Sequence, residues 1–446
     1  MKKLFFRPNM IKQAGGLTRR QFIYLSSLAT AGFLAGCAVH PVTGRRELML
    51  MSESQEIEVD RRNSPHQISA DYGAVQDKAL GDYVSHVGGS IAGQTHRPHM
   101  PYSFHVLNAP YVNAYAFPGG TIGITRGILL DLENEAELAA LIGHEAGHVS
   151  ARHTSQRMTR GLLAAVVLSG VSVAAGPDMG DLVAGLGGIG AGALLAGYSR
   201  NQEREADSLG LEYMVQSGYN PEGFVGLMSM LNEMSGKEES SMAVLFSTHP
   251  MSSERYRTAL NEVASRYEAR KRTSPVFRER YMDNTAQLRR IAPAVKAMQD
   301  GDGEMMKRNP QKAGEHYRNS LNAAPEDYAA NLKMAKCLLA LRNDREALRY
   351  SEKARSIYPA EPQAMHIKGM AHLRLRNFDQ ALSQFDSYEQ ALSGNPNTTF
   401  FQGFSLEGMG RKEQAARKYY DYLQLVNQGE YARHAYTRLQ EWGYLQ

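Results

Sequence analysis

A 34-residue period in the C-terminal third of this 446-residue chain constrains its fold more than any other feature. An alanine recurs at this spacing, at Ala313, Ala347, Ala381 and Ala415. The residue four positions later is aromatic in three of the four cases, at Tyr317, Ser351, Phe385 and Tyr419. Two further series keep the period, namely the small residues Ala335, Gly369 and Gly403 and the prolines Pro325 and Pro359. Small residues at a helix crossing, an aromatic residue one turn later and a proline after the pair predict stacked helical hairpins.

The period and these positions are the pattern of tetratricopeptide repeats. Each helix pair buries its apolar face only against its neighbours, so the stack predicts an α-solenoid with a concave surface for peptides or partner proteins. We assign residues 286–446 to this array and expect a capping helix over residues 431–442. Cys337 lies in the first helix of a repeat and is predicted to be a buried core residue.

The charge of the chain is concentrated at its N-terminus. Six of the 50 basic residues and none of the acidic residues lie in the first 36 residues. The rest of the chain contains 44 basic and 46 acidic residues. The body therefore lacks the positive excess of a nucleic-acid-binding protein, and we expect no nucleic-acid partner. At 43% hydrophobic and 22% charged residues, the composition is that of globular domains.

Residues 1–36 are predicted to be an export signal. Arg19 and Arg20, which resemble a twin-arginine signal, precede about 15 apolar residues, too few to span a bilayer comfortably. The Leu-Ala-Gly-Cys sequence ending at Cys37 resembles the lipobox of bacterial lipoproteins, which predicts a lipid on this cysteine. We therefore expect a periplasmic body anchored to a membrane, with Ala38 favouring the outer membrane. The alternative, an uncleaved anchor helix, places the body on the same side.

Residues 37–63 are predicted to be a polar tether that leads into a helix from about Glu53, and residues 64–285 a second domain. Within that domain, Tyr102, Phe104 and Val106 alternate with polar residues, and residues 111–117 and 121–125 flank Pro118-Gly119-Gly120. This pattern predicts two short strands joined by a glycine-rich turn.

Three helical segments are expected after this turn. Asn134 can cap a helix over residues 135–157. Residues 161–196, rich in glycine and alanine, are interpreted as a helical hairpin that is either buried or dips into a membrane, with burial favoured. A regular amphipathic helix over residues 198–218 then ends at a glycine.

The sequence His144-Glu145-Ala146-Gly147-His148 lies within the first of these helices. Histidines four residues apart project from one face, where they can bind one tetrahedral metal ion, and Glu145 points at the open position of that metal. A solvated helix with two ordinary histidines is the alternative for this motif alone.

The amphipathic helix offers the missing third ligand. Glu203 and Asp207 are also four residues apart, so one can bind metal while the other accepts the outer N–H of a ligand histidine. We expect Glu203 to be the ligand and Glu205 to point elsewhere.

Together these motifs resemble the gluzincin metallopeptidases of the HtpX and BepA type. The similarity extends to Pro-Val-Thr-Gly-Arg at residues 41–45, Asn-Ala-Tyr-Ala-Phe-Pro-Gly-Gly at residues 113–120, and Thr-His-Pro at residues 248–250 followed by Arg255. It implies a mainly α, zincin-like catalytic domain with a small β-hairpin or sheet. It also implies one zinc ion held by His144, His148 and Glu203, with Glu145 as the general base.

Two roles stay open within this resemblance. Asp207 is either a proton donor or a residue that holds a ligand histidine, and its spacing favours the second role. His249 either stabilises the oxyanion or occupies the fourth metal position and keeps the enzyme latent, and a structural His-Pro turn is the alternative. The strand over residues 113–117 is a candidate edge for pairing with an extended substrate.

We therefore predict a lipid-anchored zinc endopeptidase that degrades misfolded or misassembled envelope proteins, with repeats that dock substrates or the outer-membrane assembly machinery. A non-proteolytic chaperone or scaffold with a structural zinc site is the alternative, and a membrane-embedded protease is a third possibility. Two histidines and a glutamate suit zinc best without excluding cobalt or manganese.

Overall fold

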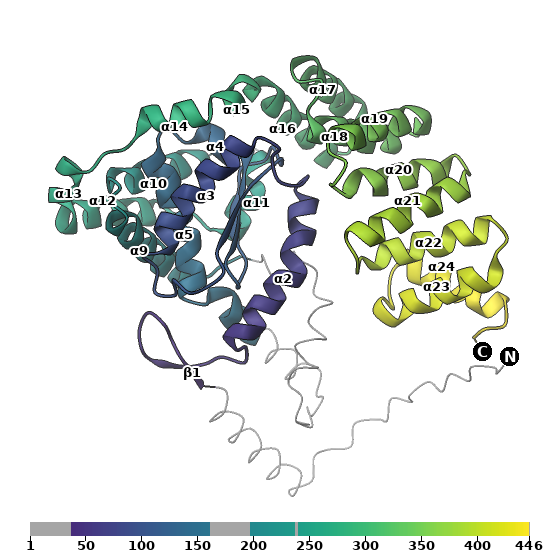
Figure 1. The fold of residues 1–446 in the computed structure, drawn as a ribbon, viewed down its shortest axis with the longest axis horizontal. Helices are drawn as coiled ribbons and strands as arrows, with labels where there is room; N and C mark the ends of the chain where they lie inside the picture. Colours follow the sequence, from purple (N-terminus) through teal and green to yellow (C-terminus); the bar gives the residue numbers. More distant parts are fainter. Residues whose placement is uncertain (1–36, 161–196, 237–239, 446) are drawn as a thin grey trace, which may run out of the picture. The chain divides into compact units, whose positions relative to one another are not determined.

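The computed structural model describes residues 37–160, 197–236 and 240–445, drawn in colour in Figure 1. They form two compact units that divide between Gly303 and Glu304. The predicted export signal, residues 1–36, and the predicted hairpin of residues 161–196 lie outside the described residues. Among the helices that the structure describes, none combines the length and the apolar character that crossing a membrane requires.

The N-terminal unit contains a three-stranded sheet with the order β3-β5-β4. Strand β4 (Ala114–Ala116) pairs antiparallel with β5 (Thr121–Thr125), which confirms the predicted hairpin, and β3 (Ser103–Leu107) pairs parallel with β5. Tyr115 lies opposite Gly123 in this register. A Cβ at Gly123 would lie 2.6 Å from the Tyr115 ring, so this position requires a glycine.

Helix α5 (Glu135–Ser150) is at the centre of this unit, and every one of its residues is buried. As predicted, the Asn134 side chain caps it by accepting the backbone N–H of Glu137. Figure 1 shows the other helices around the sheet and α5. They are α2 (Glu53–Ala70), α3 (Lys78–Ala92), α4 (Arg126–Asp131), α9 (Arg200–Gln216), α10 (Glu222–Ser235), α11 (Ala243–Thr248), α12 (Ser253–Arg266), α13 (Glu268–Thr273), α14 (Arg278–Asn284) and α15 (Ala286–Arg290), with a 3-10 turn η2 (Ser240–Met242).

Helix α5 ends at Ser150, so the prediction of one helix over residues 135–157 is wrong. Arg152 adopts a left-handed conformation with φ of 56°, and the chain becomes helical again over residues 153–160. The Arg152 side chain donates to the buried Glu56 carboxylate at 2.8 Å and to the carbonyl of Met51 at 2.7 Å. These tertiary bonds stabilise a backbone conformation that is uncommon for residues other than glycine.

Residues 37–63, predicted as a tether, fold onto the same unit. Strand β1 (Cys37–Val39) pairs antiparallel with β2 (Arg46–Leu48), and α2 begins where the sequence predicts it. The Glu56 side chain of α2 is fully buried and lies 2.7 Å from the Arg97 guanidinium. Some polar residues of this segment therefore form buried ion pairs, whereas others are exposed to solvent. Composition alone does not distinguish the two.

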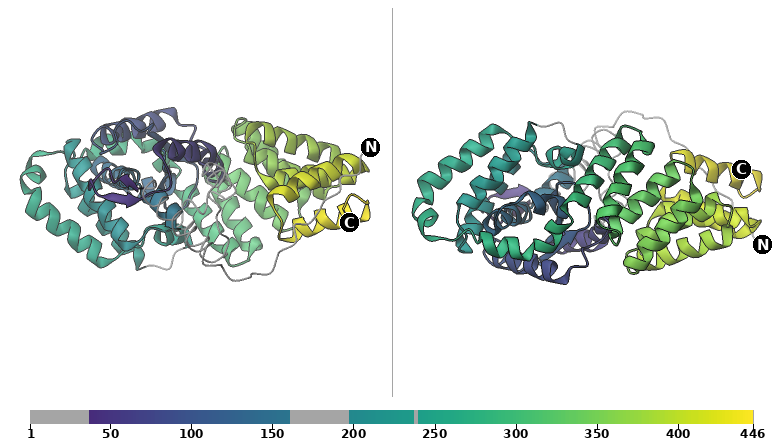
Figure 2. Two further views of the ribbon diagram at one scale, coloured as in Figure 1. Left: turned by 90° about the horizontal axis from the view of Figure 1, so that it is seen from below. Right: turned by 90° about the horizontal axis from the view of Figure 1, so that it is seen from above.

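The C-terminal helices form the predicted α-solenoid, whose successive antiparallel helix pairs are visible in Figure 2. A Cβ at Gly369 would lie 2.8 Å from the Phe385 ring, and one at Gly403 would lie 2.9 Å from the Tyr419 ring. The small and aromatic series of the repeat thus face each other where two helices cross. The helices are α16 (Ala292–Met306), α17 (Pro310–Ala323), α18 (Tyr328–Ala340), α19 (Asp344–Ile357), α20 (Gln363–Arg374), α21 (Phe378–Ala391), α22 (Pro396–Gly408), α23 (Lys412–Leu425) and α24 (Glu430–Glu441).

Two finer features of the array also follow the sequence. Cys337 is fully buried in α18, and its thiol donates to the carbonyl of Pro310 at 3.0 Å. Helix α24 is the expected capping helix. The division between the units lies within α16, later than the predicted boundary at residue 286.

Candidate metal centre

Helices α5 and α9 cross at very close range because glycines lie at their contact. A Cβ at Gly210 of α9 would lie 2.7 Å from the backbone nitrogen of His144, and one at Gly143 of α5 would lie 2.7 Å from the carbonyl oxygen of Gly210. This approach brings the first two turns of α9, which carry Glu203 and Asp207, against the histidine-bearing turns of α5.

We expect Gly210→Ala to lower the free energy of unfolding by about 1–3 kcal/mol, because the new methyl group meets backbone atoms of α5. Zinc affinity should fall as well, since α9 moves away from α5. Urea unfolding and zinc titration measure the two effects. Gly89→Ala is the matched control, because a Cβ at this helical glycine of α3 has no neighbour within 4 Å among the described residues. Equal stability of the two variants would contradict the prediction.

Four side chains converge on one point in the interior of this unit. His144, His148, Glu203 and His249 are buried, and each offers a ligand atom within 4.8 Å of the others. Nε2 of His148 lies 3.1 Å from Nε2 of His144 and 3.4 Å from Oε1 of Glu203. Nδ1 of His249 lies 3.4 Å from Nε2 of His144 and 3.2 Å from Oε1 of Glu203. Imidazole nitrogens and a carboxylate at these separations fit a tetrahedral zinc ion.

Glu145 lies beside this cluster. Burial raises the pKa of its carboxyl group. Its Oε1 lies 3.7 Å from Nε2 of His249, and its Oε2 has no hydrogen-bond partner among the described residues. A buried carboxylate with a raised pKa and a free oxygen is suited to accept a proton from a reacting group.

Asp207 faces the outer nitrogen of a candidate ligand. Its Oδ1 lies 3.0 Å from Nδ1 of His144, which leaves Nε2 of that ring toward the cluster. Arg255 of α12 donates to both Asp207 oxygens, at 2.6 and 2.7 Å, and its Nη1 lies 2.7 Å from Oε2 of Glu203. Burial by itself would raise the pKa of Asp207, but the Arg255 charge and hydrogen bonds lower it. Asp207 therefore lies where it can position His144, and the charge of Arg255 faces its carboxylate.

Tyr198 is a site residue that the sequence did not indicate. Its ring stacks on His148 with a centroid separation of 3.7 Å and an angle of 14° between the planes. Its hydroxyl lies 3.1 Å from Oγ1 of Thr154. The stacking restrains the orientation of the His148 ring. Tyr198 follows a segment rich in glycine and alanine, and no spacing links it to the metal motif.

His153 and Glu205 were also missed. Nδ1 of His153 lies 2.8 Å from Nδ1 of His148, and Nε2 of His153 lies 3.2 Å from Oε2 of Glu205. As expected, Glu205 points away from the four clustered side chains, but it lies behind His153, a contact that the sequence did not indicate. In one continuous helix, residues five apart face different directions. The break at Arg152 brings His153 back to His148, and a histidine following the motif was the available signal.

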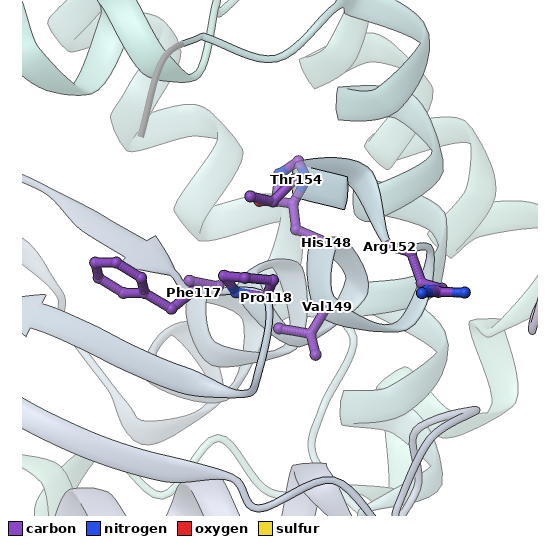
Figure 3. Close-up of a pocket in the computed structure, with 7 residues that line it drawn as sticks. Phe117, Pro118, His148, Val149, Arg152 and Thr154 are labelled. Atoms are coloured by element: carbon purple, nitrogen blue, oxygen red, sulfur yellow. The ribbon is translucent and has the colours of Figure 1, made fainter. Parts of the chain in front are cut away.

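Strand β4 occupies the edge of the sheet, as the predicted substrate-pairing strand should, but its residues are at most 3% exposed. The backbone nitrogen of Val112, just before β4, donates to the carbonyl of Ser241 in η2 at 2.9 Å. The edge is thus covered in this structure. A small, partly open pocket lies between the β4–β5 turn and the end of α5, as Figure 3 shows, and its lining consists of Ala116, Phe117, Pro118, His148, Val149, Arg152 and Thr154.

Comparisons with known proteins agree with this site. The model of peptidase family M48 matches residues 79–263, which include all four members of the cluster and Glu145. Metalloprotease YcaL of Escherichia coli (strain K12) is 30% identical over 208 residues, covering 47% of this chain and 76% of that protein. The beta-barrel assembly-enhancing protease of Yersinia pestis is 28% identical over 207 residues, covering 44% of this chain. The match spans only 41% of the length of that relative.

Among solved structures, the crystal structure of YrrB, a TPR protein with an unusual peptide-binding site, aligns with 41% of this chain and 91% of its own. The sequence identity is 20% and the TM-score is 0.31, which is too low to bear on the fold.

Proposed function

Because this chain belongs to peptidase family M48, we propose that it is a zinc-dependent endopeptidase of the bacterial envelope. The convergence of His144, His148 and Glu203 beside the free oxygen of Glu145 carries this proposal. Three ligands and an adjacent buried carboxylate are the parts that metal-assisted peptide hydrolysis needs.

Zinc bound at this cluster would supply a Lewis acid that acidifies a water molecule and polarises the peptide carbonyl. Glu145 accepts the proton of the attacking water at Oε2 and returns it to the leaving nitrogen. Asp207 holds His144 through its outer nitrogen, and Arg255 holds Asp207 and Glu203 together. The burial of these groups keeps bulk water away from the reacting atoms.

We also propose that His249 keeps the enzyme latent. Its Nδ1 faces the ligand atoms and its Nε2 faces Glu145, so the ring lies where a substrate carbonyl has to enter. Two hydrogen bonds hold the surrounding loop: the backbone nitrogen of Tyr198 donates to the carbonyl of Thr248 at 2.9 Å, and Arg255 donates to the carbonyl of Pro250 at 3.1 Å. Substrate binding therefore requires this loop to move.

Zinc content and casein cleavage, measured for the wild-type protein and for His249→Ala, test both proposals. We expect about one zinc ion per chain. If the open state makes up about 1–10% of the wild-type population, removing His249 should raise cleavage about 10- to 100-fold. His105→Ala, which alters a histidine of β3 outside the cluster, should change neither value.

The other outcomes separate the alternatives. Zinc without cleavage in either protein would favour the non-proteolytic scaffold, and absence of zinc would overturn the site. Equal cleavage by the wild-type protein and His249→Ala would overturn latency alone.

We further propose that the repeats dock misassembled envelope proteins or the outer-membrane assembly machinery, and that a lipid on Cys37 anchors the body at the outer membrane. The first proposal is supported by the α-solenoid and by the name of the Yersinia relative. The second is supported by the basic leader and by the four residues that end at Cys37.

A further inference from the structure

We infer that His153 and Glu205 form a positioning relay behind the metal centre, which orients His148 and determines which nitrogen of that ring carries its proton. The inference rests on the proposed metal site and concerns residues that are not themselves ligands. His153 is fully buried, and its Nδ1 points at His148 rather than into the cluster, so it is not a fifth ligand.

The proton positions along the relay follow from its geometry. Nε2 of His148 faces the cluster and must be unprotonated to bind a metal, so Nδ1 of the same ring carries the proton. This N–H can donate only to an unprotonated Nδ1 of His153, at 2.8 Å. The proton of His153 then lies on Nε2, which donates to the Glu205 carboxylate at 3.2 Å. Each hydrogen bond of the relay thus has one donor and one acceptor, and the assignments agree with one another.

His40, in the turn after β1, lies on the other side of Glu205 from His153. Nδ1 of His40 accepts the backbone N–H groups of Val42 and Thr43, at 3.3 and 3.2 Å, so its proton lies on Nε2. That nitrogen lies 3.8 Å from Oε1 of Glu205, and His40 is only 2% exposed. The Glu205 carboxylate is therefore located between a histidine of the N-terminal turn and His153.

Further contacts hold β2 and the residues just after it against the helical residues that carry His153. The backbone nitrogen of Leu50 donates to Oγ1 of Thr159 at 3.1 Å, and Gln156 donates to the Glu47 carboxylate at 3.1 Å. Outer partners of ligand histidines raise metal affinity by fixing the ring and its tautomer, and their loss typically weakens binding 10- to 100-fold. His148 receives this support through an imidazole, whereas His144 receives it directly from Asp207.

The test measures zinc affinity by competition with a chelator, in the full chain carrying Glu145→Gln, so that the result does not depend on peptidase activity. His153→Phe fills the site but cannot accept the His148 proton, and we expect the zinc dissociation constant to rise about 10- to 100-fold. His153→Asn keeps an acceptor close to the position of Nδ1, and we expect most of the affinity to return. His105→Asn should have no effect.

A purely structural role of His153 makes a different prediction. It would weaken zinc binding equally in His153→Phe and His153→Asn, in proportion to lost stability, and that result would overturn the relay. Unchanged affinity in His153→Phe would overturn it too. If no protein in the series binds zinc, both the proposed function and the relay are overturned. If all of them bind zinc with the same affinity, whatever the residue at position 153, only the relay is overturned.

A second pair of variants keeps the test decisive if His153→Phe does not fold. Glu205 is 31% exposed at its side chain, so Glu205→Leu is expected to fold while removing the end of the relay. Glu212→Leu is the matched change on the same helix, because among the described residues the Glu212 carboxylate has a hydrogen bond only with Gln216. We expect Glu205→Leu to bind zinc more weakly than Glu212→Leu. Equal affinities in these two variants would overturn the relay.

Discussion

Glu145→Gln is expected to reduce casein cleavage about 10²- to 10⁴-fold while the protein keeps its zinc. The amide preserves the volume of the side chain but cannot take the proton of the attacking water. The three proposed ligands are unchanged, so the metal content should stay near one per chain. Peptidase assays in the His249→Ala background, together with metal analysis, measure both quantities at the highest expected activity.

Glu133→Gln, which alters an exposed carboxylate just before α5, is the control and should retain full cleavage. Cleavage that survives in Glu145→Gln would show that another group acts as the base. The same variant tests the scaffold alternative, because binding of unfolded proteins that persists without cleavage would show that the repeats act independently of the metal centre.

Arg255→Met is expected to lower the free energy of unfolding by about 3–5 kcal/mol. Arg255 is buried between Asp207 and Glu203, and its removal leaves two buried carboxylates without their cation. Urea unfolding of the zinc-free protein measures the effect. Zinc should restore part of the loss, because a bound cation again faces Glu203.

Arg204→Met is a closely matched control for this change. Arg204 of α9 forms a two-pronged pair with Glu254 of α12, so both pairs join the same two helices, but Arg204 and Glu254 are exposed. Exposed pairs contribute about 0–1 kcal/mol. If both variants lose the same stability, burial is not the reason for the effect of Arg255.

The pH dependence has a definite sign. The folded-state pKa of Asp207 lies below its ordinary value of 3.8, so the pair with Arg255 stabilises the protein fully above that value. As the pH falls through the folded-state pKa, Asp207 takes up a proton and this contribution disappears. Without Arg255, burial raises the pKa of Asp207 in the folded variant, so the difference in stability between the wild-type protein and Arg255→Met should be largest near neutral pH and begin to shrink above pH 3.8. It should be lost once the pH falls below the folded-state pKa of the wild-type protein.

Local sequence rules were sufficient for the parts of the site that lie on single helices. The helical period places His144 above His148 and Glu203 above Asp207, whatever the rest of the chain does. The 34-residue period likewise determined the solenoid, because each repeat contacts only its neighbours. The small and the aromatic residues that recur with this period pack against each other in the structure, as Gly369 and Phe385 do.

The tertiary structure decided what these local rules leave open. Whether α5 continues past Ser150 depended on Arg152, whose left-handed backbone is held by Glu56 and Met51, about 100 residues earlier in the chain. That break, and not any periodicity, brought His153 to His148. The position of His249 against Glu145 also depends on long-range contacts of its loop. Spacing therefore identified residues that share a helix face, whereas packing between distant segments selected the residues that hold and cover them.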